Sequence, residues 1–325
     1  AFRDLGCDVS CFNIADTVQR YCRGSKLGRL FNRFVPVEPW IRKANRELVL
    51  MAREFGPDLL IVFGQNPVRA GVLAQIRSMF PVQMAYIWPD TLINLSEASI
   101  ACLPLYDLVA TYGRGTVEPF HQLGALNVMW VPLAGDPHLV EDLSSLPENK
   151  RRTFRADISF IGQWRPEREE VMQVVLDNFG DKSVKIWGLD WGRRCRGKTN
   201  ILKAWQGRAL YDKEYHAVLA ESHISLNIID DTNYPAANMR LFEIPMASGV
   251  QVCSPCPEME DEFKHGETIF YYHTLHELVD LLRNLLANDP LCQQVARHAY
   301  ELVTHRHTYR HRAQKIIEQI HSDNI

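Results

Sequence analysis

Three polar side chains, Asn238, Arg240 and Glu243, lie close together in the sequence and could bind a ligand. An arginine at the start of a helix can bind phosphate together with the free N–H groups of the helix. A carboxylate can accept two hydrogen bonds, which suits a diol. Each residue also has a structural alternative. Arg240 and Glu243 are spaced to pair on one helix face, and Glu243 would be favourable near the positive end of the helix dipole.

Asp90 is the best acidic candidate in the first half of the chain, because it follows an apolar run at residues 83–88. A carboxylate at the end of a strand can act as a general base. It could instead cap the turn that begins at Thr91. His138 is a weaker candidate for the same catalytic role.

The sequence predicts no metal site. Cys253 and Cys256 form a single CxxC pair, whereas zinc needs about four ligands. Asp230 and Asp231 are adjacent and therefore lack the Asp-x-Asp spacing of a metal-binding acidic motif. We interpret the cysteine pair as part of a loop that follows a buried strand.

The composition is that of an ordinary globular protein, with 325 residues, 46% hydrophobic residues, 23% charged residues and a formal net charge of −3. This charge does not favour nucleic acid or an anionic membrane as a partner. No apolar run approaches the roughly 20 residues of a membrane span, and the residues from Ala1 onward show no signal-peptide pattern. The eight cysteines suit a reducing cytoplasm, so we expect a cytoplasmic protein. The chain starts inside an apparent helix, and we expect further residues upstream of Ala1.

Short apolar runs alternate with helical patterns along both halves, which is typical of parallel sheets with crossover helices. We therefore predict an α/β protein with two doubly wound Rossmann-like domains facing a cleft. Such sheets bind ligands outside the carboxyl ends of their strands. Residues 136–155 are polar and form the candidate linker. The expected strands are residues 7–12, 59–63, 83–88, 108–111, 128–133, 157–161, 184–187, 224–228, 251–253 and 268–272.

Several segments of the second half resemble the group 1 glycosyltransferases of GT-B fold, and specifically their CgeB-like (spore maturation protein) branch. The similarity runs in order through residues 155–320, and the first half matches more loosely, through VQMAYIWPDT, YDLVATY and VPLAGDP. The segments that carry it are DISFIGQWRPERE, VKIWGLDWG, YHAVLAESHISLNI, NMRLFEIPMASGV, FKHGETIFYYHTLHELVDLL and HTYRHRAQKI.

The resemblance implies three parts: an acceptor-side domain at 1–140 whose first strand lies upstream, a donor domain at 150–305, and a helix at 306–325 that returns to the first domain. It implies a nucleotide-sugar donor as substrate, an unidentified acceptor, and no cofactor. Glu243 would bind the ribose diol and Arg240 the diphosphate, while Asp90 would be the catalytic base. The remaining donor-binding residues implied are Gly162, Arg165, Gly188, Trp191 and Asn238.

Some of these roles have open alternatives. Trp191 could stack near the base or pack on its own domain, and Arg165 could be solvated. The wider group carries two glutamates separated by seven residues; counting back from Glu243, the first of these positions is Pro235. Two other functions therefore stay open, a nucleotide-sugar epimerase on the same fold and a non-catalytic scaffold that binds the nucleotide sugar.

Overall fold

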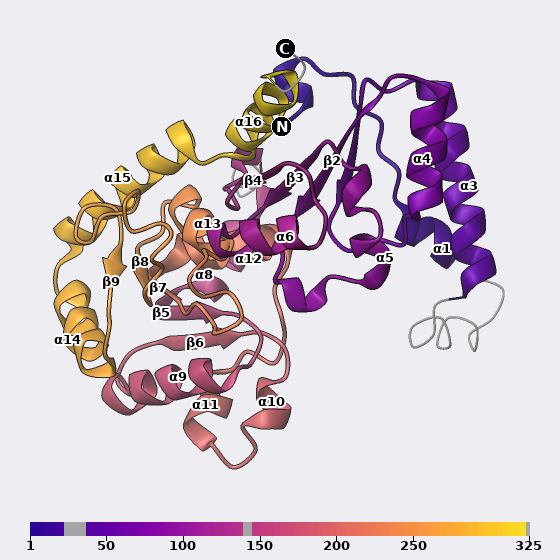
Figure 1. The fold of residues 1–325 in the computed structure, drawn as a ribbon. Helices are drawn as coiled ribbons and strands as arrows, with labels where there is room; N and C mark the ends of the chain where they lie inside the picture. The colour runs from indigo at the N-terminus through magenta and orange to yellow at the C-terminus, as the bar shows by residue number, and fades with distance from the viewer. Residues whose placement is uncertain (23–36, 139–144, 323–325) are drawn as a thin grey trace. The chain divides into compact units, whose positions relative to one another are not determined.

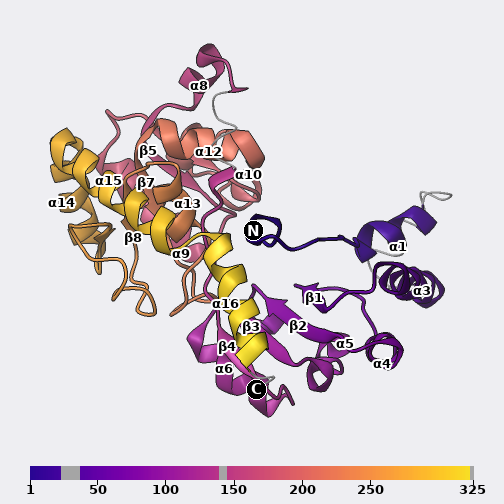
Figure 2. The same cartoon turned by 90° about the horizontal axis from the view of Figure 1, so that it is seen from above.

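The chain forms two compact units in a computed structural model that describes residues 1–22, 37–138 and 145–322. The first unit comprises Ala1–Pro132 and Ala313–Ile325, and the second comprises Leu133–Arg312. Each unit is built around one parallel sheet with helices packed against it (Figures 1 and 2). Within the described ranges, no helix is both long and apolar enough to cross a membrane.

The first unit has a four-stranded sheet in the order β1-β2-β3-β4, and all three strand pairs are parallel. The alternating side chains of these strands enter two separate apolar clusters. One cluster joins β1, β2 and β3 to α1, α3 and α4, and the other contains Ile316 and Ile320 of α16. The strands are β1 (Leu59–Phe63), β2 (Gln83–Trp88), β3 (Leu108–Thr111) and β4 (Val128–Trp130).

The helices of this unit begin and end at residues that suit those positions. In α3, Pro39 lies in the first turn, and Gly56 ends the helix with a φ of 63°. Helices α1, α3 and α4 lie together on one side of the sheet in Figure 1. The helices are α1 (Ile14–Cys22), α3 (Glu38–Phe55), α4 (Ala70–Met79), α5 (Glu97–Ile100), α6 (Val117–Gln122) and α16 (Tyr309–Ser322), with short 3-10 turns η1 (Arg3–Leu5), η2 (Leu92–Asn94), η3 (Leu103–Leu105) and η4 (Arg114–Thr116).

The second unit has a five-stranded sheet in the order β6-β5-β7-β8-β9, again parallel throughout. Both faces are covered. Phe160 and its neighbours on one face pack against α9, α14 and α15, and Ile161 and Trp187 pack on the other face against α12 and α13. The strands are β5 (Ala156–Ile161), β6 (Val184–Trp187), β7 (Ser222–Asn227), β8 (Gln251–Cys253) and β9 (Phe270–Tyr271).

The helices of the second unit include α14, whose first turn carries a capping box between Thr274 and Glu277. The full set is α8 (Glu148–Phe154), α9 (Pro166–Asn178), α10 (Trp191–Arg194), α11 (Thr199–Ala204), α12 (Asp212–Glu221), α13 (Arg240–Met246), α14 (Leu275–Leu286) and α15 (Asp289–Arg306).

The predicted α/β class with two parallel sheets is confirmed, but two local predictions are wrong. Residues 7–12 form no strand, because they pair with no strand of the four-stranded sheet, in which β1 is an edge. The expected linker 136–155 contains α8, because Phe154 is buried against α12 and anchors a helical turn. Residues 139–144 of that linker lie outside the described part.

Candidate functional site

The strand order of the second unit defines where a ligand site is expected. From β5 the chain moves to β6 on one side, and it later returns to β7 on the other side of β5. The loops that follow β5 and β7 therefore part at this point, where doubly wound sheets bind their ligands. The residues that gather here come from the loop after β5, the first turn of α9, the loop after β7, and α13.

Arg240 lies across the end of β5. Its Nε donates a 2.6 Å hydrogen bond to the carbonyl of Ile161. The guanidinium covers Gly162, where an added Cβ would come within 3.0 Å of Arg240 Nη2 and 2.8 Å of the Phe160 ring. The glycine therefore makes room for the guanidinium. Within the described chain Arg240 has no ion pair, so the alternative pairing with Glu243 is not what positions it.

Arg168 and Asp230 form a buried ion pair beside Arg240, and the sequence analysis assigned neither of them to the site. Arg168 Nη2 lies 2.6 Å from Asp230 Oδ2, and both side chains are about 95% buried. Arg168 Nη1 also donates to the carbonyl of Gln163 at 2.9 Å. Arg168 could have been predicted from the sequence, because it follows Arg165 by three residues, a spacing that places two side chains close together at a helix start.

The charges of this group influence one another. Burial and the nearby Arg240 lower the pKa of Arg168 to about 10, so it is still protonated at neutral pH. Burial by itself would raise the pKa of Asp230, but a hydrogen bond from Thr232 and the charge of Arg168 bring it below its ordinary value of 3.8. Asp230 is therefore ionised, and it neutralises only part of the positive charge at the end of β5.

Arg165 adds a third guanidinium to the same place. It directly precedes α9, is exposed, and its charge contributes to the lowered pKa of Asp230. Arginines therefore outnumber the one carboxylate that contacts them. A site with this excess of fixed positive charge favours an anion with more than one negative charge.

Glu243 lies on α13, one turn beyond Arg240, and is half-buried. Its Oε2 accepts a 2.5 Å hydrogen bond from the hydroxyl of Tyr215 on α12. Burial, and next the charge of Glu243, raise the pKa of Tyr215 well above its ordinary value, so the hydroxyl keeps its proton and donates. Within the described residues, Glu243 Oε1 accepts no hydrogen bond, which leaves one oxygen for a ligand hydroxyl.

Asn238 fixes the start of α13 from inside the domain. Its amide donates to Asn227 Oδ1 at 2.7 Å, and the amide of Asn227 donates to Gln251 Oε1 at 3.1 Å. The carbonyl oxygen of Asn238 is buried and has no hydrogen-bond partner in the structure. The residue therefore positions Arg240 and keeps one acceptor unused.

Gly188 and Trp191 hold the loops after β5 and β6 together. Gly188 has a φ of 151°, and a Cβ there would run into the carbonyl oxygen of Gly162. Trp191 is fully buried, donates from Nε1 to that same carbonyl at 2.8 Å, and meets Phe160 edge-on. Trp191 therefore packs within its own domain, and its buried ring offers no face on which a nucleotide base could stack. The glycine is required by the approach of two loops.

Asp90 belongs to the first unit, where it follows β2. Its Oδ1 accepts the N–H of Thr91 at 2.7 Å, and its Oδ2 accepts the amide of Asn94 at 2.7 Å. These contacts hold the η2 turn, whose N-cap is the neighbouring Thr91. A role as general base remains a prediction for this residue. His138 is exposed and lies in the second unit.

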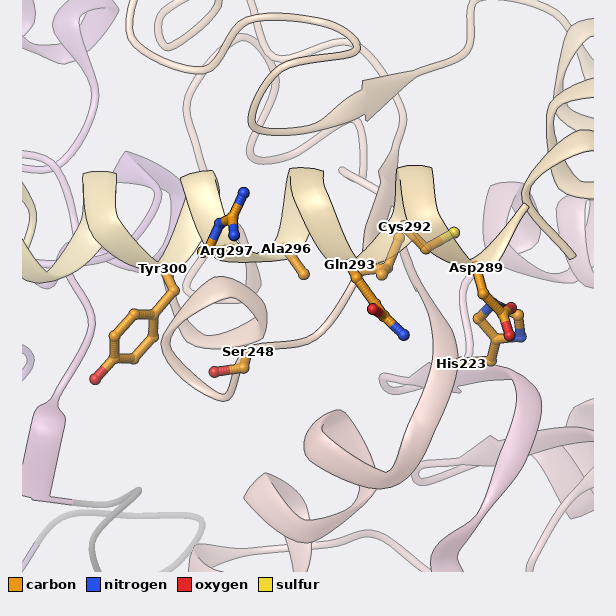
Figure 3. Close-up of a pocket in the computed structure, with 9 residues that line it drawn as sticks. His223, Ser248, Asp289, Cys292, Gln293, Ala296, Arg297 and Tyr300 are labelled. Carbon is orange, nitrogen blue, oxygen red and sulfur yellow. Dashed lines mark ion pairs between the residues drawn. The ribbon is translucent and has the colours of Figure 1, made fainter.

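Two further features, the cysteine pair and a surface cavity, contain none of the residues predicted to bind the donor. Burial raises the pKa of Cys253 well above the usual range and that of Cys256 to about 12, so both thiols are protonated. A surface cavity of about 470 Å³ is lined by α15 and by His223, the second residue of β7, which forms an ion pair with Asp289 (Figure 3). This cavity is at the amino end of β7, and none of the predicted donor-binding residues lines it.

One family model matches part of the chain. Residues 165–318 match the family described as "Glycosyl transferase-like". No curated protein sequence matches the chain. The matched segment includes Arg165, Arg168, Asp230, Arg240 and Glu243.

Solved structures show the same fold at low sequence identity. A glycosyltransferase from Rickettsia africae is 9% identical, with a TM-score of 0.64, over 91% of this chain and 87% of that one. The sucrose-phosphate synthase of Thermosynechococcus elongatus is 14% identical, with a TM-score of 0.59, over 89% and 80%. Anabaena HepE in complex with UDP-glucose is 14% identical, with a TM-score of 0.59, over 86% and 82%. The fold is therefore that of the GT-B glycosyltransferases.

Proposed function

We propose that this protein is a glycosyltransferase of the CgeB-like branch that uses a nucleotide-sugar donor and needs no metal ion. The observation that carries the proposal is the group of three arginines, Arg165, Arg168 and Arg240, around one contacting carboxylate, Asp230. A nucleotide sugar brings a diphosphate with roughly two negative charges to the site. The arginines would bind it.

The same charges would assist the reaction. When the glycosidic bond to the diphosphate breaks, negative charge develops on the leaving oxygen. Fixed guanidiniums that are already oriented stabilise that charge without reorganisation, which is the usual largest contribution to such catalysis. Arg240 is fixed by its bond to Ile161 and Arg168 by its bonds to Gln163 and Asp230. A metal ion would then not be required to supply positive charge.

Glu243 is proposed to bind the ribose. Its Oε1 is available, and the hydroxyl of Tyr215 holds the other oxygen and so fixes the plane of the carboxylate. Because Oε2 still has a second lone pair, the carboxylate can accept both hydroxyls of a diol. Asn238 would act by holding the start of α13, and its buried carbonyl could accept one hydrogen bond from the donor.

The proposal is tested by titrating UDP and UDP-glucose, since the structurally similar Anabaena HepE was solved with both. A ligand concentration of about 100 times the dissociation constant should raise the free energy of unfolding by about 2.7 kcal/mol. Arg240→Met and Glu243→Gln should each weaken binding by about ten-fold to 150-fold, because hydrogen bonds to charged groups contribute about 1.5–3 kcal/mol. Arg310→Met and Glu301→Gln change exposed residues of the same types and should leave binding unchanged.

The alternatives give different outcomes in the same experiments. An epimerase would convert a labelled nucleotide sugar into an isomer without any acceptor. A scaffold would bind the donor with the same dependence on Arg240 and Glu243 but would transfer no sugar to any acceptor. If neither UDP, GDP, ADP nor their sugar conjugates bind to the wild-type protein, the proposal is wrong.

A further inference from the structure

The two places where the chain passes between its units are joined to each other. The chain enters the second unit at Leu133 and leaves it after Arg312. The N–H of Gly135 donates to the carbonyl of His307 at 2.9 Å, and the N–H of Tyr309 donates to the carbonyl of Gly135 at 3.2 Å. Gly135 and Thr308 form an isolated parallel bridge. We call residues 133–136 and 306–312 the crossing segments.

Arg312 holds the crossing segments together from inside. It is 95% buried, and its Nη2 donates to the carbonyl of Leu133 at 3.1 Å. The same guanidinium donates to the carbonyl of Arg306 at 3.2 Å and to Nδ1 of His307 at 2.9 Å. Burial lowers the pKa of Arg312 to about 10, so it carries its charge at neutral pH. One buried cation thus binds both segments.

The joined segments rest directly on α13, the helix that carries Arg240 and Glu243. A Cβ at Gly135 would come within 2.8 Å of Met246 Cε and 3.3 Å of Met246 Cβ, so this segment lies directly against the helix. Phe242, which adjoins Glu243, contacts His307 and Arg312 with ring-centroid and Cζ distances of 5.7 Å each. A shift of α13 therefore cannot occur without a response from the crossing segments.

Tyr309 makes a second connection, through its side chain. The N–H of Ala134 donates a hydrogen bond to the Tyr309 hydroxyl. Burial is the main cause of the raised pKa of Tyr309, and the charge of Glu243 is the next, which places the two groups within electrostatic reach of each other. The side chain therefore joins one crossing segment to Ala134 of the other.

We propose that Arg312 and Tyr309 are positioning residues that couple nucleotide binding at α13 to the two crossing segments. The inference rests on the proposed function, because it takes Arg240 and Glu243 as the nucleotide site. Binding of a nucleoside diphosphate tightens α13, and α13 tightens the segments through Phe242 and Met246. By reciprocity, loosening the segments weakens nucleotide binding.

The test is hydrogen exchange of the full chain with and without saturating UDP, GDP or ADP. We expect slower exchange at residues 238–246 and, with the same nucleotide dependence, at the amides of Ala134 and Gly135. Arg312→Met should speed exchange in the crossing segments of the free protein and weaken nucleotide binding by about five-fold or more. Tyr309→Phe, which removes only one hydroxyl, is the milder variant in case Arg312→Met does not fold. Arg310→Met, an exposed arginine on the same helix, is the matched control.

The outcomes separate the two proposals. Protection of residues 238–246 without any protection at residues 133–136 overturns the coupling and leaves the nucleotide site intact. The coupling is also wrong if Tyr309→Phe and Arg312→Met bind nucleotide as tightly as the control. Absence of protection at residues 238–246 with every nucleotide overturns the proposed function, and with it the coupling.

Discussion

Breaking the buried pair of Arg168 and Asp230 should cost the second unit several kcal/mol, by an amount that depends on pH. Arg168→Met keeps the length of the side chain but leaves a buried carboxylate that retains hydrogen bonds only from Thr232 and Asn233. Removing one partner of a buried ion pair typically costs about 3–5 kcal/mol. The structure also sets a ceiling on this cost.

The cost of the substitution is limited because Asp230 can take up a proton and become neutral. Protonating a carboxyl with an ordinary pKa of 3.8 at pH 7 costs about 1.36 kcal/mol for each of roughly three pH units, or about 4 kcal/mol. The folded variant would then bind a proton that the unfolded chain does not, so the stability of the variant rises as the pH falls. At pH 5, protonation of the same carboxyl costs only about 1.6 kcal/mol. In the wild-type protein the pKa of Asp230 lies below 3.8, so this group adds no pH dependence between pH 5 and 7.

Urea unfolding of wild type and Arg168→Met at pH 5, 6 and 7 measures this effect, with the buried Trp187 and Trp191 reporting on the second unit. The difference in unfolding free energy between wild type and variant should be about 4 kcal/mol at pH 7 and about 2 kcal/mol at pH 5. Adding Asp230→Asn to the variant should restore stability at pH 7 and remove the pH dependence. A cost that is the same at pH 5 and pH 7, or below about 1 kcal/mol at pH 7, would refute the reasoning.

Three further predictions follow from single contacts. Gly188→Ala should destabilise the second unit by more than about 3 kcal/mol in urea unfolding, because the new Cβ meets a main-chain carbonyl, whereas Gly197→Ala, also at positive φ but in open space, should cost about 1–2 kcal/mol. Asp90→Asn should lower the rate of sugar transfer by about 100-fold or more at unchanged donor affinity if Asp90 is the general base, and an unchanged rate would assign it to capping alone. Cys253 and Cys256 should resist a thiol reagent at pH 8 until the protein is unfolded, because burial raises the pKa of both thiols, and labelling of either in the native protein would contradict this.

The sequence predicted most of the framework because that framework depends on local patterns. Apolar runs such as residues 59–63 and 83–88 are read directly as buried strands, and the structure confirms both with the expected bounds. A strand also needs a neighbour, however, and no local pattern supplies one. For that reason residues 7–12 alternate like a strand but form none in the structure. The helix Glu148–Phe154 was missed because its only apolar anchor in the core is Phe154.

The site was less predictable, because it depends on which loops meet. The segment 238–243 identified Arg240 and Glu243 as candidates, yet the sequence could not show that Arg240 would bind a carbonyl of β5 instead of pairing with Glu243. Asp230 was considered only as a metal ligand, since its arginine partner lies far away in the sequence. For Trp191 the sequence left two alternatives open, and the structure shows the ring buried beneath the ligand loop.

The placement of Asp230 explains how the arginine group can be both stable and ready to bind. Three guanidiniums near one another repel. The pKa of Arg168 is lowered by burial and, next, by the charge of Arg240. Asp230 contacts the buried arginine, whose unpaired charge would be the most costly, and makes no ion pair with Arg240 or Arg165. The charges left uncompensated are therefore the half-buried and exposed ones, which water can solvate until an anion arrives. If Asp230 instead contacted Arg240, the site would be neutral where we propose that the diphosphate binds.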